Sequence, residues 1–310
     1  MDRDLIGSGR YQFVSHENGT NFKLKRNEKW RVAGEPYLAG VEYKLIQEQA
    51  AALAAFSAQE IYSVGFNNRL EREDMEKKHG KEINVEAEET RVVWVLMCRG
   101  DGQWADPRIP QAFSLALDRQ EMINLMNFGE GRVSGPVPPA FGEALPENEL
   151  LETWGKHDPA EAKKLLAASA FDTSKEYTFK YPVLGDRYQQ FATIAKSQLE
   201  KTLGLKIKLA PEEFGRWLSQ SLYGSDFDGF QGFTSLSYDD PTSYIAVYSK
   251  TYGGRPNWAG WNNDELDAAV DAQKAILDDR ERLKAVQEIQ RNAWKAGSPF
   301  IPTFIAVGSG

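Results

Sequence analysis

The period of apolar positions changes several times along the chain and separates predicted strands from predicted helices. Runs that alternate apolar and polar residues, or are rich in β-branched and aromatic residues, predict strands at 10–14, 22–26, 41–46, 61–64, 83–87 and 91–97. The turn-forming sequence Glu17-Asn18-Gly19 joins the first two strands. Two helices are expected in this region, an Ala-rich one at 48–58 and a polar one at 70–79 that ends before Gly80.

Aspartate residues mark helix starts from residue 106 onward. Asp106 precedes Pro107, and proline suits the first position of a helix. Asp118 and Asp158 are each followed three residues later by a glutamate, which predicts a capping box at each position. These are structural signals and carry no chemistry.

Strands and helices alternate from residue 177 to residue 233. Strands are predicted at 177–183, 206–209 and 227–233, and helices at 188–203 and 214–222. This order is typical of βαβ units, so the sequence predicts an α/β fold class with helices covering a sheet. Two amphipathic helices follow, with Leu266 and Val270 sharing a face of the first, and Val286 and Ile289 a face of the second.

The composition describes a globular protein with an acidic balance. Lys and Arg number 37 against 45 Asp and Glu, which gives a net charge of −8. This argues against a general nucleic-acid binder, which would carry a basic patch. The longest apolar run, residues 92–98, is far shorter than the ~20 residues that span a bilayer. It predicts a buried strand, with Cys98 at its end as a buried and unreactive thiol.

No catalytic or metal-binding constellation stands out. His16, His79 and His157 lie in polar turns or helix ends and lack the paired spacing of a metal site. Asp239 and Asp240 are adjacent acids beside aromatic residues, but neighbours in an extended chain point to opposite faces. Turn-forming or helix-capping roles are therefore expected for them. The sequence predicts no enzyme and no cofactor or metal.

Potential ligand contacts are densest where a strand ends and a loop begins, after residue 230. Ligands of open α/β sheets favour the crevice beyond the carboxyl ends of the strands. Phe233 and Tyr238 offer stacking faces there, while Thr234, Ser235 and Ser237 offer neutral hydrogen bonds.

A second aromatic run contains Trp258 and Trp261, just before a predicted helix. Aromatic residues make up 12% of the chain. They supply core volume as well as stacking surfaces for ligands. A binding surface and a core-packing loop are equally good interpretations of this run.

Motifs of one protein family follow each other in order along almost the whole chain. The most recognisable stretch joins Asp106-Pro107-Arg108 to Ala116-Leu117-Asp118-Arg119 as two consecutive helix starts. Further segments with family-like sequences lie at 7–13, 25–30, 58–61, 158–166, 204–207, 240–241, 261–267 and 279–282. Each motif alone is weak, but their order is specific. The chain resembles the family 5 extracellular solute-binding proteins, the peptide, nickel and related receptors of bacterial ABC importers.

The resemblance implies an α/β, type II periplasmic-binding-protein-like fold, with two lobes of mixed sheets that close on a ligand by a hinge. Residues 1–105 would form part of lobe I, residues 106–298 lobe II, and residues 299–310 the start of the return to lobe I. It also implies an internal part of a longer protein, with lobe I incomplete and a C-terminal tail missing.

The function implied by the resemblance is that of the substrate-binding component of a bacterial ABC importer. Such a protein captures a small solute, for example a peptide or a sugar, between its lobes and delivers it to permease subunits in the membrane. We expect a periplasmic or extracellular protein, with or without a lipid anchor, that is monomeric at full length and binds no nucleic acid. The ligand wall in lobe II is expected to contain Tyr181, Tyr223, Gln231, Phe233, Thr234, Ser235, Ser237, Tyr238, Trp258 and Trp261.

Departures from the family pattern bear on the ligand. Peptide-binding relatives tend to carry a Trp and an Asp in the ligand strand, and these positions are Thr234 and Ser237 here, counting back from Asp240-Pro241. The missing Asp would have met the amino group of a peptide, so a neutral ligand such as a sugar is favoured. The alternative function is a ligand-sensing domain of a regulator or receptor with the same fold. A carbohydrate-active enzyme that uses Asp239 or Asp240 is a more distant alternative.

Overall fold

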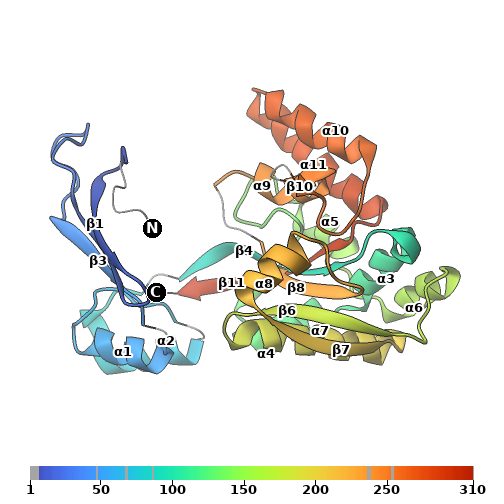
Figure 1. The fold of residues 1–310 in the computed structure, drawn as a ribbon, viewed down its shortest axis with the longest axis horizontal. Coiled ribbons are helices and arrows are strands. Elements are labelled where there is room, and N and C mark those ends of the chain that lie inside the picture. Colours follow the sequence, from blue (N-terminus) through green and yellow to red (C-terminus); the bar gives the residue numbers. More distant parts are fainter. Residues whose placement is uncertain are drawn as a thin grey trace. The chain divides into compact units, whose positions relative to one another are not determined.

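The computed structural model describes residues 7–46, 48–66, 69–85, 87–235, 239–252 and 255–309. The chain divides into two compact units, Met1–Asn67 and Asn68–Ser309. Figure 1 shows the helices and strands of both units.

The first unit contains a small antiparallel sheet and one helix. Its three-stranded sheet has the order β1-β2-β3, and the elements are β1 (Tyr11–Glu17), β2 (Asn21–Arg26), β3 (Gly40–Lys44) and α1 (Gln49–Ser57). The turn between β1 and β2 closes because the Thr20 N–H donates to the Glu17 carbonyl at 3.0 Å, with Gly19 at φ +76°. These elements confirm the predicted strands and helix. The strand predicted at 61–64 is wrong, because these residues pair with no neighbouring strand within the described chain.

The second unit is built on a six-stranded sheet with the order β5-β11-β4-β8-β6-β7. The strands are β4 (Ala87–Cys98), β5 (Gly131–Val133), β6 (Glu176–Val183), β7 (Lys206–Glu213), β8 (Phe230–Thr234) and β11 (Phe300–Ser309). β6 runs parallel to β7 and β8, whereas β4 pairs antiparallel with β8 and β11, and β11 with β5. The sheet is therefore mixed, as expected for the predicted fold class. Strands β9 (Thr251–Tyr252) and β10 (Arg255–Pro256) form a separate pair.

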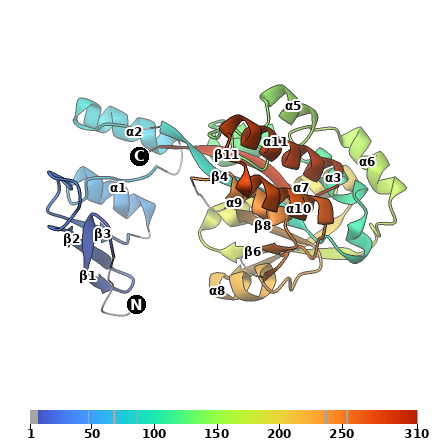
Figure 2. The same cartoon turned by 90° about the horizontal axis from the view of Figure 1, so that it is seen from above.

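Helices cover both faces of this sheet, as Figures 1 and 2 show. One face carries α3 (Arg108–Ala116), α4 (Arg119–Asn127), α6 (Pro159–Ala168) and α7 (Asp186–Leu203). The other carries α5 (Glu147–Glu152), α8 (Phe214–Arg216) with the π-helical turn η3 (Trp217–Leu222), α9 (Thr242–Ile245), α10 (Asp264–Ala272) and α11 (Asp279–Lys295). The remaining elements are α2 (Arg69–His79) and the short helical turns η1 (Gly80–Glu82), η2 (Gly102–Ala105), η4 (Ala246–Tyr248) and η5 (Gln273–Ala275).

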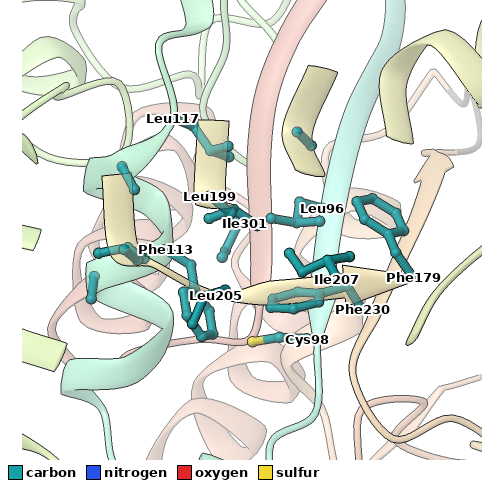
Figure 3. Packing of buried hydrophobic residues seen from close by; sticks show 14 of the residues in the cluster. Leu96, Cys98, Phe113, Leu117, Phe179, Leu199, Leu205, Ile207, Phe230 and Ile301 are labelled. Carbon is teal, nitrogen blue, oxygen red and sulfur yellow. The ribbon is translucent and has the colours of Figure 1, made fainter. Parts of the chain in front are cut away.

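Successive side chains of β4 contribute alternately to two hydrophobic cores, one on each face of the sheet. Val93, Val95 and Met97 belong to the core under α10 and α11, while Leu96 and Cys98 belong to the core under α3 and α7. Successive side chains of a strand point to opposite faces, so a strand covered on both sides reads as a continuous apolar run. Figure 3 shows Leu96 and Cys98 among the side chains of the second of these cores.

The predicted helix starts are confirmed at Asp118 and Asp158, whose side chains accept from the backbone N–H groups of Glu121 and Glu161. At Asp106 the helix begins one residue later than predicted, with Pro107 rather than Asp106 at the N-cap, and the Asp106 carboxylate accepts from the Arg108 N–H at 3.0 Å.

The predicted strand at 83–87 is wrong for residues 83–85, which belong to no strand, and β4 begins at Ala87. The lobe boundaries predicted after residues 105 and 298 stay a prediction. The compact units divide at Asn67, so that β4 and β11 share a unit with residues 106–298.

Candidate functional site

An aromatic-lined cavity lies at the carboxyl ends of β6 and β8 in the second unit. Its volume is about 260 Å³, and Pro182 near the end of β6 and Thr234 at the end of β8 both line it. Further walls come from β4, α7, α8, η3, α9, η4, β11 and the loop that carries Trp258. This is the place where open α/β sheets bind ligands.

A continuous series of ring contacts, here called the aromatic belt, runs around the cavity. It consists of Phe214, Trp217, Phe233, Trp258 and Tyr223. The successive centroid distances are 6.2, 6.3, 6.2 and 5.4 Å. Aromatic pairs at such separations gain energy beyond the area that they bury. The belt therefore presents large, rigid apolar faces to the cavity.

The π-helical turn η3 brings one side of the belt into place. Glu213 caps the preceding α8 by accepting from the Gly215 and Arg216 N–H groups, each at 2.9 Å. The turn itself carries the wide hydrogen bond of a π-helix, from the Tyr223 N–H to the Leu218 carbonyl at 3.0 Å. Single π-helical turns occur frequently at functional sites.

Ser221 connects η3 to the sheet through hydrogen bonds with residues of β6 and β8. Its carbonyl accepts from Gln231 Nε2 at 2.8 Å, and its hydroxyl accepts from Lys180 Nζ at 3.0 Å. The Lys180 ammonium is paired with the Glu212 carboxylate at 3.2 Å. This polar network holds the residues of η3 that line the cavity against β6, β7 and β8.

Neutral hydroxyls lie at the end of β8. Thr234 Oγ1 and the Tyr188 hydroxyl are 3.1 Å apart and share a hydrogen bond. Ser235 Oγ accepts from the Val93 N–H at 2.9 Å, so this hydroxyl closes the β8–β4 pairing. Burial raises the pKa of Tyr248, another lining residue, so its phenol stays protonated.

The predicted ligand residues differ in whether they line the cavity. Five of them do so, namely Tyr223, Phe233, Thr234, Ser235 and Trp258. Ser237 and Tyr238 lie outside the described residues. Whether any of these residues contacts a ligand stays a prediction.

The remaining predicted residues, Tyr181, Gln231 and Trp261, do not line this cavity. Tyr181 is packed in the core under α7, and burial raises its pKa. Gln231 is fully buried and bonded to η3. Trp261 packs against Gly100, where an added Cβ would lie 2.5 Å from the Trp261 Cβ. A glycine at the contact point therefore lets this tryptophan enter the core.

Sequence reasoning missed Trp217, Phe214 and Tyr188. Phe214 and Trp217 are three residues apart in a segment that was predicted as a helix, and this spacing places them on one face. This aromatic pair, which precedes a predicted ligand-facing strand in the sequence, is the signal from which Phe214 and Trp217 could have been predicted as cavity residues. Tyr188 carries no comparable signal, since it stands near the start of a long amphipathic helix.

Asp240 has the expected turn-forming role at the start of α9, whereas Asp239 is held by an ion pair instead. Asp240 accepts from the Thr242 N–H at 2.7 Å and from Arg282 Nη2 at 2.9 Å. Asp239 is exposed and pairs with Arg91. Neither residue lines the cavity, so nothing here assembles a carboxylate pair around a substrate bond.

Other potential chemistry is also accounted for within the described residues. His16 and His157 are exposed. Burial raises the pKa of the Cys98 thiol, which keeps it protonated and unreactive. No cluster of three or more His, Cys, Asp or Glu suited to a metal occurs in that part of the chain. The helices described there also include none with the length and apolarity of a membrane span.

Comparison with known proteins gives a consistent result. The family described as "Bacterial extracellular solute-binding proteins, family 5 Middle" matches residues 2–255. The oligopeptide-binding protein AppA of Bacillus subtilis is 25% identical over 307 residues, covering 92% of this chain and 54% of AppA. The periplasmic oligopeptide-binding protein OppA of Salmonella typhimurium is 24% identical, over 99% of this chain and 56% of OppA. The chain thus spans about half the length of these curated relatives.

Solved structures show the same fold. The structure of the binding protein AgaA from A. tumefaciens R10, in complex with agropinic acid, has a TM-score of 0.78 and 20% identity. The match covers 61% of the AgaA chain and 97% of this chain. The type II periplasmic-binding-protein-like α/β fold predicted from the sequence is confirmed. The matching proteins are solute-binding proteins rather than enzymes.

Proposed function

The chain belongs to the bacterial extracellular solute-binding proteins of family 5, and from this premise we propose that it captures a small solute for a bacterial ABC importer. It then delivers the solute to the permease subunits in the membrane. A periplasmic or extracellular location accords with the family and with the relatives. The lobe assignment given above, with residues 106–298 as one lobe and flanking segments of another, is part of this proposal.

The aromatic-lined cavity is the observation that carries the proposal. Small-molecule sites are concave, mostly apolar and equipped with few polar groups. The cavity has these properties, stands at the carboxyl ends of β6 and β8, and is lined by Phe233, Thr234 and Trp258. We assign ligand contact to these residues together with Tyr223 and Ser235.

The solute class follows less directly from the relatives. AppA and OppA are named for oligopeptides, whereas AgaA was solved with agropinic acid. One scaffold therefore serves several ligands, and the residues at the site decide among them. A peptide is the class that the curated relatives favour, while Thr234 in the ligand strand suits a neutral group.

Calorimetric titration with a panel of short peptides, oligosaccharides and small organic acids tests this function. The change Phe233→Leu with Thr234→Val should weaken binding of the best solute at least tenfold, because it removes a ring face and a hydroxyl. The same chemical change away from the cavity, Phe171→Leu with Thr193→Val, is the control and should leave the affinity unaltered. Unchanged affinity in the first variant would refute the placement of the site, and binding of no solute would refute the function.

A further inference from the structure

The lining of the cavity holds no charged side chain. The lining residues that the structure describes include no Asp, Glu, Lys, Arg or His. Lys180, which contacts η3 through Ser221, pairs with Glu212 at 3.2 Å and is not part of the lining. Moving a charge from water to such a wall without a partner is strongly unfavourable. A group that is buried in this cavity must therefore be uncharged.

Several hydroxyl groups of the lining are already hydrogen-bonded within the protein. The hydroxyls of Tyr188 and Thr234 bond to each other at 3.1 Å. Tyr244 donates its hydroxyl to a backbone carbonyl of β4 at 2.6 Å, and Ser243 Oγ donates to the Asp240 carbonyl at 2.9 Å. These bonds occupy hydrogen-bonding capacity that a polar ligand group would need. The contact that the cavity offers is therefore mainly apolar.

Exposure changes along the lining from a surface rim to a closed end. Leu184 and Phe214 line the cavity and are 51% and 39% exposed, whereas Tyr248 and Phe300 also line it and are 1% and 3% exposed. The cavity therefore opens to the surface beside Leu184 and Phe214. A solute can place one group in the closed part and keep the rest of its structure at the rim, in contact with water.

The volume of the cavity fits one aromatic ring with a small substituent. An apolar cavity of about 150 Å³ stays dry and admits benzene. The volume here is about 260 Å³. Phe233 contacts the rings of Trp217 and Trp258, and all three line the cavity, so a ligand ring meets both faces and edges of aromatic side chains.

We propose that the cavity binds an uncharged aromatic group of an otherwise polar solute and discriminates against charged groups of the same size. This inference rests on the proposed function and specifies the chemistry of its solute. Among peptides it favours a phenylalanine side chain in the cavity over lysine, arginine, aspartate or glutamate. The polar remainder of the solute stays outside the closed part of the cavity.

Two pairs of probes with nearly the same shape test the proposal. Ethylbenzene and benzylammonium differ by a methyl and an ammonium group, and isopropylbenzene and benzoate by an isopropyl and a carboxylate group. In calorimetry on the 310-residue chain, each neutral probe should bind at least tenfold more tightly than its charged partner, because the charged probe loses hydration without gaining a counter-charge. In proton NMR, ethylbenzene should shift the indole resonances of Trp217 and Trp258 and leave that of Trp104, which is buried in the other core, unchanged.

A charge placed in the wall should change the preference. Ser243→Asp puts a carboxylate at a half-buried lining position and should reduce the preference for ethylbenzene over benzylammonium at least fivefold, because the ammonium group then has a partner. Ser169→Asp is the matched control. Ser169 is also half-buried, and its Oγ donates to the Leu166 carbonyl three residues earlier, as Ser243 Oγ does to that of Asp240. It lies outside the cavity, so this variant should retain the preference.

Filling the cavity should block the probes. Leu218→Trp adds bulk at a half-buried lining position and should weaken ethylbenzene binding at least tenfold. Leu165→Trp makes the same change at a half-buried position beside the other core and should leave ethylbenzene binding unaltered. Circular dichroism checks that each variant is folded, and the comparison of probes on the unaltered chain does not depend on any variant.

The outcomes distinguish this inference from the function on which it rests. The inference would be overturned if a charged probe bound as tightly as its neutral partner, if Ser243→Asp left the preference unchanged, or if none of the probes bound. In each of these cases the solute panel described under the proposed function still decides whether the protein captures a solute, because that panel includes charged and hydrophilic compounds.

Discussion

The two compact units use similar sequence patterns but bury very different amounts of their apolar side chains. In the second unit, residues 93–98 of β4 alternate into two cores, and Leu96 and Met97 have no exposed surface. In the first unit the buried residues among those described are Asn27, Pro36 and Val64. Its sheet leaves Val14 at 50% and Tyr43 at 60% exposure. Alternation thus specifies a strand in both units, whereas burial depends on what covers it.

Rings in the first unit contact each other without being enclosed. Phe22 lies 5.4 Å from Phe13 and 6.4 Å from Tyr43, measured between ring centroids. Cross-strand pairs of this kind stabilise a sheet by only about 0.2–1 kcal/mol each. In the second unit Phe230 contacts Phe113 at 5.1 Å and Trp104 at 5.5 Å with no exposed surface. The comparison predicts that equal substitutions have unequal effects in the two units.

The largest difference is expected for phenylalanine truncation. Phe230→Ala should lower the free energy of unfolding by about 3–5 kcal/mol, because it leaves a cavity in an enclosed core. Phe22→Ala should cost about 1 kcal/mol or less, since its ring is half-buried and covered by a few neighbours. Urea unfolding followed by tryptophan fluorescence and by far-ultraviolet circular dichroism measures both. Equal losses in the two variants would contradict the comparison.

Glycine substitution gives a second contrast. A Cβ at Gly232 in β8 would lie 2.9 Å from ring carbons of both Phe179 and Phe191, whereas nothing lies within 4 Å of a Cβ at Gly65. Overpacking of a closed core costs about 1–3 kcal/mol, so Gly232→Ala should be destabilising by that amount. Gly65→Ala should be neutral or slightly stabilising, because it reduces the freedom of the unfolded chain. Thermal melts of both variants measure these effects. A Gly232→Ala variant with unchanged stability would argue against tight packing around β8.

Much of the fold was predictable, and the errors share a physical cause. Helices with strong end signals, such as those that begin after Asp118 and Asp158, were predicted correctly because a cap is a local interaction. The strand predicted at 61–64 is wrong because its apolar residues find no partner strand in the part of the chain that the structure describes, and no local signal reveals this.

The site was predicted in part for a related reason. Phe233 lies on the candidate cavity because it stands near the end of a strand in an α/β sheet, where the sequence predicts a ligand site. Trp261 was assigned to the ligand wall but packs against Gly100, a contact that depends on tertiary approach. Trp217 was missed because its position on the cavity depends on a π-helical turn, and the sequence 214–222 reads as an ordinary helix.

Helix capping should give a smaller difference than core packing. Asp118 Oδ1 accepts from the Glu121 N–H at 2.9 Å, while α1 in the first unit has no side-chain cap at Glu48. Asp118→Ala should therefore cost about 1 kcal/mol, and Asp118→Asn, which retains an acceptor, much less. Glu48→Ala should leave the free energy of unfolding nearly unchanged. Chemical denaturation is the measurement, and an equal loss for the Ala variants at the two positions would show that the cap at Asp118 contributes little.

The smallest expected effect concerns the ion pair between α5 and α11. Arg291 donates from Nε and Nη2 to the Glu149 carboxylate at 2.5 and 2.9 Å, and these bonds lower the pKa of Glu149 below its ordinary value. A depressed carboxylate pKa stabilises the fold above the pKa of the unfolded glutamate, and this stabilisation is lost as the pH falls through the folded value. The pair is part-buried, so its worth is about 0.5–1 kcal/mol.

Glu149→Gln should therefore lower the free energy of unfolding at pH 7 by that small amount and converge with the unaltered protein only once the pH has fallen below the depressed folded pKa of Glu149, where the glutamate is protonated in both states. The first unit offers a weaker counterpart in the Lys23–Glu42 pair, whose side chains are 45% and 42% exposed. Exposed pairs of this kind often contribute nothing measurable, so Glu42→Gln should change the free energy of unfolding by less than about 0.5 kcal/mol at pH 7. Urea titrations from pH 3 to 8 measure both variants. A Glu149→Gln protein that stays equally destabilised below the folded pKa of Glu149 would assign the loss to packing rather than to charge, because protonation would already have removed the ion pair from the unaltered protein.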